Sequence, residues 1–468
     1  MLKFTQSMLI ALTAIFAACW HCYARDGYDL SGKPNIVFIL ADDLGMHQVG
    51  CYGTDFYETP HIDQLAAKGM RFTNAYAACH VCSPTRASIM TGKYPARLGL
   101  TDYIPGKKKS PAGARLVQSD WNMSLALGEV TVAESLKTAG YATGHFGKWH
   151  LNVDKKYKPG RSGDPGSQGF DDVFTTHKPK AGPPSKYEND AHHVREITER
   201  SVAFIDKNKD KPFFCYVTHN SIHSPELERE KLIAKYKGRT GAKKGGRLNP
   251  VQAAMLETLD KSVGAICKKI KELGIERNTI VVFFSDNGQL GPDKGQPLRG
   301  SKGNFYEGGI RMPFVVKWPG VVTAGSVCDE VMISTDFFPT FNEIAGVRSS
   351  VKNIDGVSLT PVLKDANASL GRKAVFWHFP HYRNKTIGPH GAMRKGRYKL
   401  VEWYEKSVFG EDEAFEVYDL VDDPAEQKNL ASSKPALVKS MVAEFKKWRK
   451  DVGAQEMTKK PDIDLEVH

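Results

Sequence analysis

The chain has 468 residues, of which 41% are hydrophobic and 25% are charged, so it is long enough to bury a large core. This composition excludes a disordered chain and a collagen-like chain. The formal net charge of +12 suggests a polyanionic partner, although a solvated basic surface explains the charge equally well.

The first 24 residues are typical of a signal peptide. Lys3 supplies a positive charge, residues 8–18 are almost wholly apolar, and small residues allow cleavage after Ala24. This apolar run is too short to span a bilayer and no later segment is long enough, so we predict no membrane span. We expect an exported protein, periplasmic or secreted, with lipid attachment at Cys19 as the alternative. If the protein is exported, its polyanionic partner is expected to be a sulfated polysaccharide rather than a nucleic acid.

Eight cysteines are scattered along the chain, and two of them lie in the predicted signal peptide. The other six do not form the dense pattern of a disulfide-stabilised fold. Cys79 and Cys82 form a C-x-x-C pair, which in other proteins is redox-active or binds a metal. Because the sequence contains no second pair, we do not predict a zinc site.

Apolar strand patterns alternate with helical patterns through most of the chain. The predicted strands cover residues 34–40, 141–145, 212–218, 279–284 and 314–317. The predicted helices cover residues 61–69, 132–140 and 255–270. Strands that alternate with helices predict an α/β fold with a doubly wound, mostly parallel sheet.

The pattern changes after about residue 370. Short aromatic and charged segments follow, among them residues 399–404 and 415–418, and residues 435–452 form an amphipathic helical pattern. We therefore predict a smaller C-terminal α+β domain at 371–468, with a short antiparallel sheet and a helix. It is expected to pack on a larger α/β domain at 25–370.

Acidic and amide side chains follow two of the predicted strands. Asp42 and Asp43 come after the first strand, and Asp286 and Asn287 come after the fourth. In open α/β sheets, ligands bind at the carboxyl ends of the strands, so these side chains are expected to lie together. Oxygen ligands suit calcium or magnesium rather than zinc or copper, and calcium accepts a looser ligand set. Taken alone, either cluster is also explained by a turn or a helix cap without a metal.

Basic residues follow two other predicted strands. Lys148 and His150 come after the second strand, and His219 and His223 come after the third. A lysine and a histidine two positions apart beyond a strand end point the same way, which suits binding of an oxyanion. A single histidine is more often structural than catalytic.

The most informative stretch begins at Cys82. Residues 82–86 read C-S-P-T-R, and residues 91–93 read T-G-K. The signature C-x-P-x-R followed by T-G-(K/R) belongs to the type I sulfatases, within the alkaline-phosphatase-like superfamily. The chain resembles this family from Lys33 into its C-terminal segment, which implies an alkaline-phosphatase-like fold and a sulfuric ester hydrolase.

The resemblance implies that Cys82 is oxidised to formylglycine (3-oxoalanine) by a formylglycine-generating enzyme. One hydroxyl of the hydrated aldehyde then attacks sulfur. The sulfated diol releases sulfate by collapsing to the aldehyde, whereas a sulfated thiol has no such route to release sulfate. The resemblance also implies a Ca²⁺ ion held by Asp42, Asp43, Asp286 and Asn287, with the modified Cys82 as a further ligand.

The remaining roles are implied in the same way. Arg86 is expected to steady the diol, and Lys148 and Lys302 are expected to bind sulfate oxygens. His150 is expected to act as a base during collapse of the intermediate, and His223 is expected to protonate the leaving alkoxide.

The segment 377–383, W-H-F-P-H-Y-R, combines aromatic, histidine and arginine side chains. Such side chains suit stacking on a sugar ring and pairing with anions, and His381 and Arg383 are the candidates for substrate binding. Similar sequences in polysaccharide-degrading bacteria favour a sulfated oligosaccharide substrate. We expect exo-action on a galactose- or N-acetylgalactosamine-type unit.

Three alternatives to a carbohydrate sulfatase stay open. The first is a broad-specificity arylsulfatase. The second is a phosphonate or phosphate monoester hydrolase of the same superfamily, although a zinc phosphatase needs more histidine ligands than this site offers. The third is a non-catalytic polyanion-binding protein with a degenerate site. The sequence argues against it, because every expected catalytic position carries the expected residue.

Overall fold

The computed structural model describes residues 32–107, 109–153, 160–179, 184–291, 297–348 and 350–461. The predicted signal peptide and Cys19 lie outside the described residues. The described residues from Pro34 onward form one compact unit. In the described ranges, no helix is long and apolar enough to cross a membrane.

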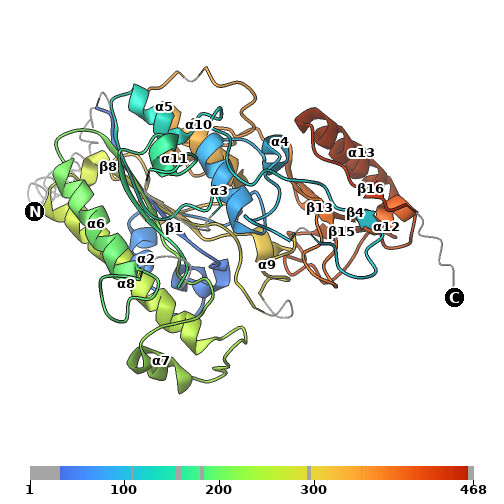
Figure 1. Cartoon of the computed structure of the whole chain (residues 1–468), viewed down its shortest axis with the longest axis horizontal. Coiled ribbons are helices and arrows are strands. Elements are labelled where there is room, and N and C mark those ends of the chain that lie inside the picture. Colours follow the sequence, from blue (N-terminus) through green and yellow to red (C-terminus); the bar gives the residue numbers. More distant parts are fainter. Residues whose placement is uncertain are drawn as a thin grey trace, which may run out of the picture. The chain divides into compact units, whose positions relative to one another are not determined.

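Among the described residues, an eight-stranded sheet forms the centre of this unit (Figure 1), in the order β10-β2-β9-β8-β1-β7-β5-β6. The strand bounds are β1 (Asn35–Ala41), β2 (Met70–Phe72), β5 (Ala142–Lys148), β6 (Asp172–Thr176), β7 (Phe213–Thr218), β8 (Thr279–Ser285), β9 (Phe314–Lys317) and β10 (Ser326–Cys328). Only β9 runs antiparallel to its described neighbours, β2 and β8. The predicted mostly parallel sheet is confirmed.

Helices cover both faces of this sheet. On one face lie α3 (Cys82–Thr91), α5 (Val132–Thr138), α10 (Phe337–Ile344) and α11 (Thr360–Lys364), and on the other lie α2 (Pro60–Ala67), α6 (Val194–Lys207) and α8 (Pro250–Glu272), with α7 (Glu230–Lys237) against α8. All seven residues of β1 are buried. Ile36 and Phe38 enter the core under α3 and α10, whereas Val37 and Ile39 enter the core under α8. A strand buried on both faces explains the continuous apolar run in the sequence.

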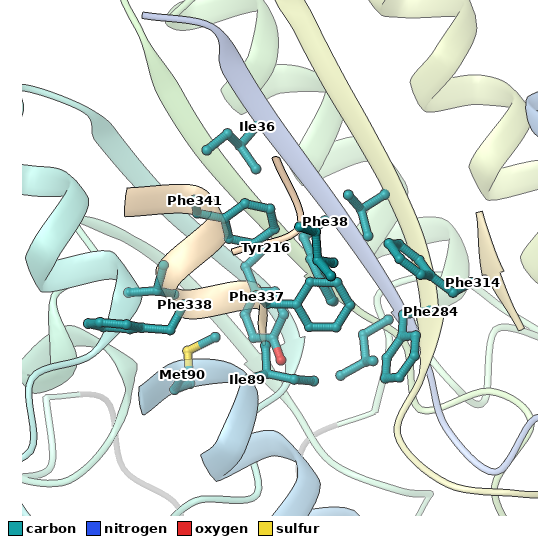
Figure 2. Packing of buried hydrophobic residues seen from close by; sticks show 14 of the residues in the cluster. Ile36, Phe38, Ile89, Met90, Tyr216, Phe284, Phe314, Phe337, Phe338 and Phe341 are labelled. Atoms are coloured by element: carbon teal, nitrogen blue, oxygen red, sulfur yellow. The ribbon is translucent and has the colours of Figure 1, made fainter. Parts of the chain in front are cut away.

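Aromatic packing holds α3 and α10 on the sheet (Figure 2). The ring of Phe38 meets Phe337 edge-on, with centroids 4.8 Å apart, and Phe341 lies beside them. Ile89 and Met90 of α3 belong to the same cluster. All ten residues of α3 are buried, so the position of its first residue, Cys82, is set by close packing rather than by a surface loop.

The C-terminal segment forms a second, smaller sheet. The antiparallel strands are β12 (Val375–Phe379), β13 (His390–Lys395), β14 (Tyr398–Trp403) and β15 (Phe415–Asp419), and α13 (Pro435–Val452) packs against them. This confirms the predicted antiparallel sheet and helix, while the domain boundary at residue 370 stays a prediction. The other short elements are β3 (Ala75–Tyr76), β4 (Leu116–Val117), β11 (Met332–Ile333), β16 (Thr458–Lys459), α4 (Pro95–Leu98), α9 (Glu307–Ile310) and α12 (Tyr404–Phe409).

A buried ion cluster connects the small sheet to the segment that carries Lys302. Lys399 of β14 is fully buried and contacts Glu307 Oε1 at 2.9 Å and Glu426 Oε1 at 2.8 Å. Glu426 Oε2 also accepts a hydrogen bond of 2.7 Å from the backbone N–H of Glu307. Breaking a buried pair by removing one partner leaves an uncompensated charge, so this cluster fixes the start of α9, five residues after Lys302.

Candidate functional site

A cavity of about 540 Å³ opens where the central strands end. This volume is in the range of small-molecule sites in proteins. Its lining includes Asp42, Cys82, Lys148, His150, His223 and Lys302. Lys148 is the last residue of β5, and the others come from segments that follow β1, β5, β7 and β8 and from the first turn of α3, so the structure brings the predicted clusters to one place.

The two acidic clusters lie side by side because β1 and β8 are parallel neighbours in register, with Ala41 opposite Ser285. The backbone N–H of Asp43 donates to Asp286 Oδ1 at 3.3 Å. Asn287 Nδ2 donates to Asp43 Oδ1 at 2.8 Å. Asp43 has a φ of 63°, an uncommon conformation for a residue other than glycine. Such strained residues persist where the surrounding structure holds them, often at functional sites.

Cys82 lies between these carboxylates and a lysine. Its Sγ is 3.6 Å from Asp42 Oδ1 and 3.5 Å from Lys302 Nζ. Burial raises the pKa of the Cys82 thiol to about 11, although Lys148 and Lys302 act in the opposite direction. An unmodified thiol at this position is therefore protonated at neutral pH and is a weak nucleophile.

Arg86 lies one turn after Cys82 on α3 and is buried. Its Nε donates to Asp286 Oδ2 at 2.8 Å, and its Nη1 donates to the carbonyl of Lys148 at 2.7 Å. Arg86 thus connects the end of β5 with the carboxylate that follows β8. These side-chain hydrogen bonds go to the acidic group and the β5 backbone, and Cys82 acts on Arg86 electrostatically.

Two buried lysines pair with the two aspartates that follow β1. Lys148 Nζ is 2.6 Å from Asp42 Oδ2, and Lys302 Nζ is 2.6 Å from Asp43 Oδ1. Burial opposes ionisation of Asp42, but the charges of Lys148 and other basic groups outweigh it and hold the pKa of Asp42 well below its usual range. Gly147, with a φ of 122°, allows β5 to lie close to the end of β7, because a Cβ there would lie 1.8 Å from the Thr218 carbonyl oxygen.

The two histidines at the cavity are oriented by backbone carbonyls. His150 Nε2 donates to the Ile104 carbonyl at 2.6 Å, so in the neutral ring Nδ1 carries the lone pair. His223 Nδ1 donates to the Ser224 carbonyl at 2.6 Å, and its Nε2 lies 3.7 Å from Asp43 Oδ2. His219, in contrast, is fully buried with Nε2 3.1 Å from Ser262 Oγ and does not line the cavity.

The acidic group fits a hard divalent cation. Ligand atoms of Asp42, Asp43, Cys82 and His223 all lie within 4.8 Å of one another. Within the described residues, Asp43 Oδ2 and Asn287 Oδ1 are buried and accept no hydrogen bond. Buried polar atoms normally have a partner, and two buried oxygen atoms without one, on residues that contact each other, suit a cation that prefers oxygen ligands.

The segment 377–383 reaches the cavity through Arg383. This residue lines the cavity, whereas His381 is fully buried with Nε2 2.8 Å from Thr101 Oγ1. Protein encloses the ring of His381, so of the two candidates Arg383 is the one that lines the cavity, and their role in substrate binding stays a prediction. Trp377 is also buried, and its Nε1 donates to the Ala77 carbonyl at 2.8 Å.

Other parts of the cavity wall were not expected from the sequence. They include Tyr103, Ile104, His177, Lys178 and Leu290. These residues lie in loops that are far apart in the sequence and show no motif or regular spacing. Only the folded arrangement of the loops identifies them.

Known families and proteins match almost the whole described chain. The sulfatase family model matches residues 34–347, and the model of the N-sulphoglucosamine sulphohydrolase C-terminal region matches residues 301–451. A sulfatase of Formosa agariphila is 33% identical over 87% of this chain and 86% of its own length. Human arylsulfatase A is 31% identical, covering 91% and 86%. An N-acetylgalactosamine-6-O-sulfatase of Bacteroides thetaiotaomicron is 27% identical, covering 92% and 95%.

Solved structures of other proteins are also similar to this chain over most of its length. The structure of Ps i-CgsB in complex with k-i-k-neocarrahexaose superposes with a TM-score of 0.74 at 26% identity, covering 89% of this chain and 93% of that one. A phosphonate monoester hydrolase of Agrobacterium radiobacter gives a TM-score of 0.64 at 18% identity, covering 92% and 100%. At that identity the likeness shows the fold alone.

Proposed function

The chain belongs to the sulfatase family and is a sulfuric ester hydrolase, and on this premise we propose that it removes sulfate from a sulfated carbohydrate. The observation that carries the proposal is the position of Cys82 in the cavity, 3.5 Å from Lys302 and beside the acidic group. We further propose exo-action on a galactose- or N-acetylgalactosamine-type unit. The similarity to an N-acetylgalactosamine-6-O-sulfatase and to a protein solved with a neocarrahexaose supports this choice.

We propose that a formylglycine-generating enzyme converts Cys82 to formylglycine during maturation. The raised pKa of the thiol supports this, since the unmodified side chain is a weak nucleophile. The hydrated formylglycine would supply the attacking oxygen, and a Ca²⁺ ion held by Asp42, Asp43, Asp286 and Asn287 would reduce the negative charge on the reacting groups.

The chain's own side chains then bind the sulfate and move the protons. Lys148 and Lys302 are placed to bind sulfate oxygens, and Arg86 holds Asp286 in position. His223 in its protonated form would give the Nε2 proton to the leaving sugar oxygen, and Nδ1 of the neutral His150 ring would accept a proton when sulfate is released. The proton that the attacking hydroxyl loses restores His223, and the proton that His150 accepts passes to solvent, because hydrolysis of a sulfate ester to alcohol and sulfate releases one proton per turnover at neutral pH.

We also propose that residues 1–24 are a signal peptide and that the protein acts in the periplasm or outside the cell. The apolar run at residues 8–18 supports export. Lipid attachment at Cys19 is the alternative, and the N-terminal mass of the protein purified from its host distinguishes the two.

Sulfate release from a substrate panel tests the proposed function. The chain is co-expressed with a formylglycine-generating enzyme and assayed on sulfated galactose, sulfated N-acetylgalactosamine, 4-nitrophenyl sulfate and 4-nitrophenyl phosphate. We expect kcat/KM to be highest for a sulfated sugar. A preference for the aryl sulfate would favour a broad arylsulfatase, and activity on the phosphate alone would contradict sulfate ester hydrolysis.

Replacing His223 is expected to affect substrates according to their leaving groups. His223→Ala should lower kcat/KM for a sugar sulfate by about 10²–10⁴-fold, the usual contribution of a general acid. The loss on 4-nitrophenyl sulfate should be much smaller, because 4-nitrophenolate leaves without a proton. His219→Gln, at the buried histidine four residues earlier, serves as the control. Equal losses on both substrates would exclude His223 as the acid.

A further inference from the structure

The described lining of the cavity carries basic residues in addition to the two lysines beside Cys82. Lys148 and Lys302 pair with Asp42 and Asp43 next to Cys82. Lys178 and Arg383 also line the cavity, and Asp42 is the acidic residue among its described lining. The described lining is therefore predominantly cationic, which favours a substrate with negative charge beyond the sulfate that is cleaved.

The side chain of Arg383 is held in place by its neighbours. Its stem packs on Gly303, where a Cβ would lie 3.3 Å from both Cγ and Nε of the arginine. Its guanidinium lies 5.4 Å from the centre of the Tyr103 ring, within cation–π range. Lys107 Nζ donates to the Arg383 carbonyl at 3.2 Å, and the Arg383 N–H donates to the Ile387 carbonyl at 2.9 Å. A group ordered before binding loses less entropy when a ligand arrives.

Arg383 is half-buried, yet its guanidinium forms no ion pair with a described carboxylate. Asp102 acts on it electrostatically, but burial raises the pKa of Asp102 to about 7, and Asp102 Oδ1 accepts a hydrogen bond of 2.7 Å from the Tyr103 N–H. The planar fork of a guanidinium matches the oxygen pairs of sulfate and carboxylate groups.

We propose that Arg383, assisted by Lys178, forms a second anion subsite for a sulfate ester or carboxylate on the leaving saccharide. This inference rests on the proposed function, and it narrows the substrates of the enzyme to saccharides that carry a second anionic group. The preferred substrate then carries at least two anionic groups, of which one is hydrolysed and the other is bound by Arg383.

Kinetics on matched substrates test the subsite. The substrates are N-acetylgalactosamine 6-sulfate, its 4,6-disulfate, and a disaccharide that joins the 6-sulfate to a uronic acid. For the preferred dianionic substrate, Arg383→Gln should reduce the kcat/KM ratio over the monosulfate by about tenfold or more, the effect of losing one charge-assisted pair. Lys385→Gln changes an exposed residue of the same turn outside the cavity lining and should leave this ratio unchanged.

The outcomes separate the possible sources of the second anion. A preference for the disulfate identifies a sulfate ester, and a preference for the uronic acid disaccharide identifies a carboxylate. Equal losses on all three substrates, or a wild-type enzyme without preference for a dianionic sugar, would overturn the subsite.

A binding measurement separates failure of the subsite from failure of the proposed function. Calorimetry on the full chain with Cys82→Ala uses the disulfated sugar and the uronic acid disaccharide, in turn, as the probe, with and without Arg383→Gln. Affinity that falls about tenfold on Arg383→Gln supports the subsite even if no substrate is hydrolysed. Hydrolysis of sugar sulfates together with unchanged probe affinity would refute the subsite and leave the sulfatase reaction standing.

Discussion

Cys82→Ala is expected to lower kcat for sulfate release by about 10⁴-fold or more, the scale seen when a nucleophile is removed from an enzyme. The side chain lies in the cavity beside Asp42 and Lys302, and no other described cysteine lines this cavity. Sulfate release is measured on the best sugar of the panel, and thermal unfolding checks that the variant still folds.

Cys267→Ala is the matched control, since Cys267 is a partly buried free cysteine outside the cavity. It should keep nearly full activity. Mass spectrometry of the peptide that contains Cys82 should show the aldehyde in the active wild-type enzyme. Activity that survives Cys82→Ala, or full activity with an unmodified thiol, would contradict the proposed nucleophile.

Asp43→Asn is expected to abolish the stabilisation of the protein by calcium and to lower activity by about 10²–10³-fold, because removal of a preorganised electrostatic group at a reacting centre has effects of this size. Asp43 contacts Asn287 and Lys302, and its Oδ2 is buried without a hydrogen bond from a described residue. The substitution keeps the shape of the side chain and removes its charge.

The measurement is thermal unfolding of each variant with calcium and with a chelator. Calcium at 100 times its Kd should stabilise the wild-type protein by about 2.7 kcal/mol, through binding to the folded state alone. Asp206→Asn, an exposed aspartate on α6, should keep the full calcium effect. A calcium effect that persists in Asp43→Asn would place the cation elsewhere, and its absence from the wild-type protein would refute the site.

The sequence by itself determined the layers of the fold and the position of the reacting centre. The runs that became β1 and β8 are apolar throughout because both faces of these strands are buried. The residues after them, Asp42 and Asp286, had to converge because parallel neighbours end at the same edge of a sheet. The C-S-P-T-R stretch at residues 82–86 identified the family, and the matches to sulfatases confirm that assignment.

The tertiary structure alone decided which side chains form the rest of the cavity wall. His381 and Arg383 are two residues apart beyond the end of β12, where no strand period tells which one faces inward. Packing enclosed His381 and left Arg383 at the cavity, next to Tyr103 from a distant loop. The antiparallel pairing of β9 with β8 and the buried ion pair between Lys399 and Glu307 also depend on contacts between residues that are far apart in the sequence. Local patterns specify elements and their buried faces, whereas contacts between distant loops depend on how those elements pack.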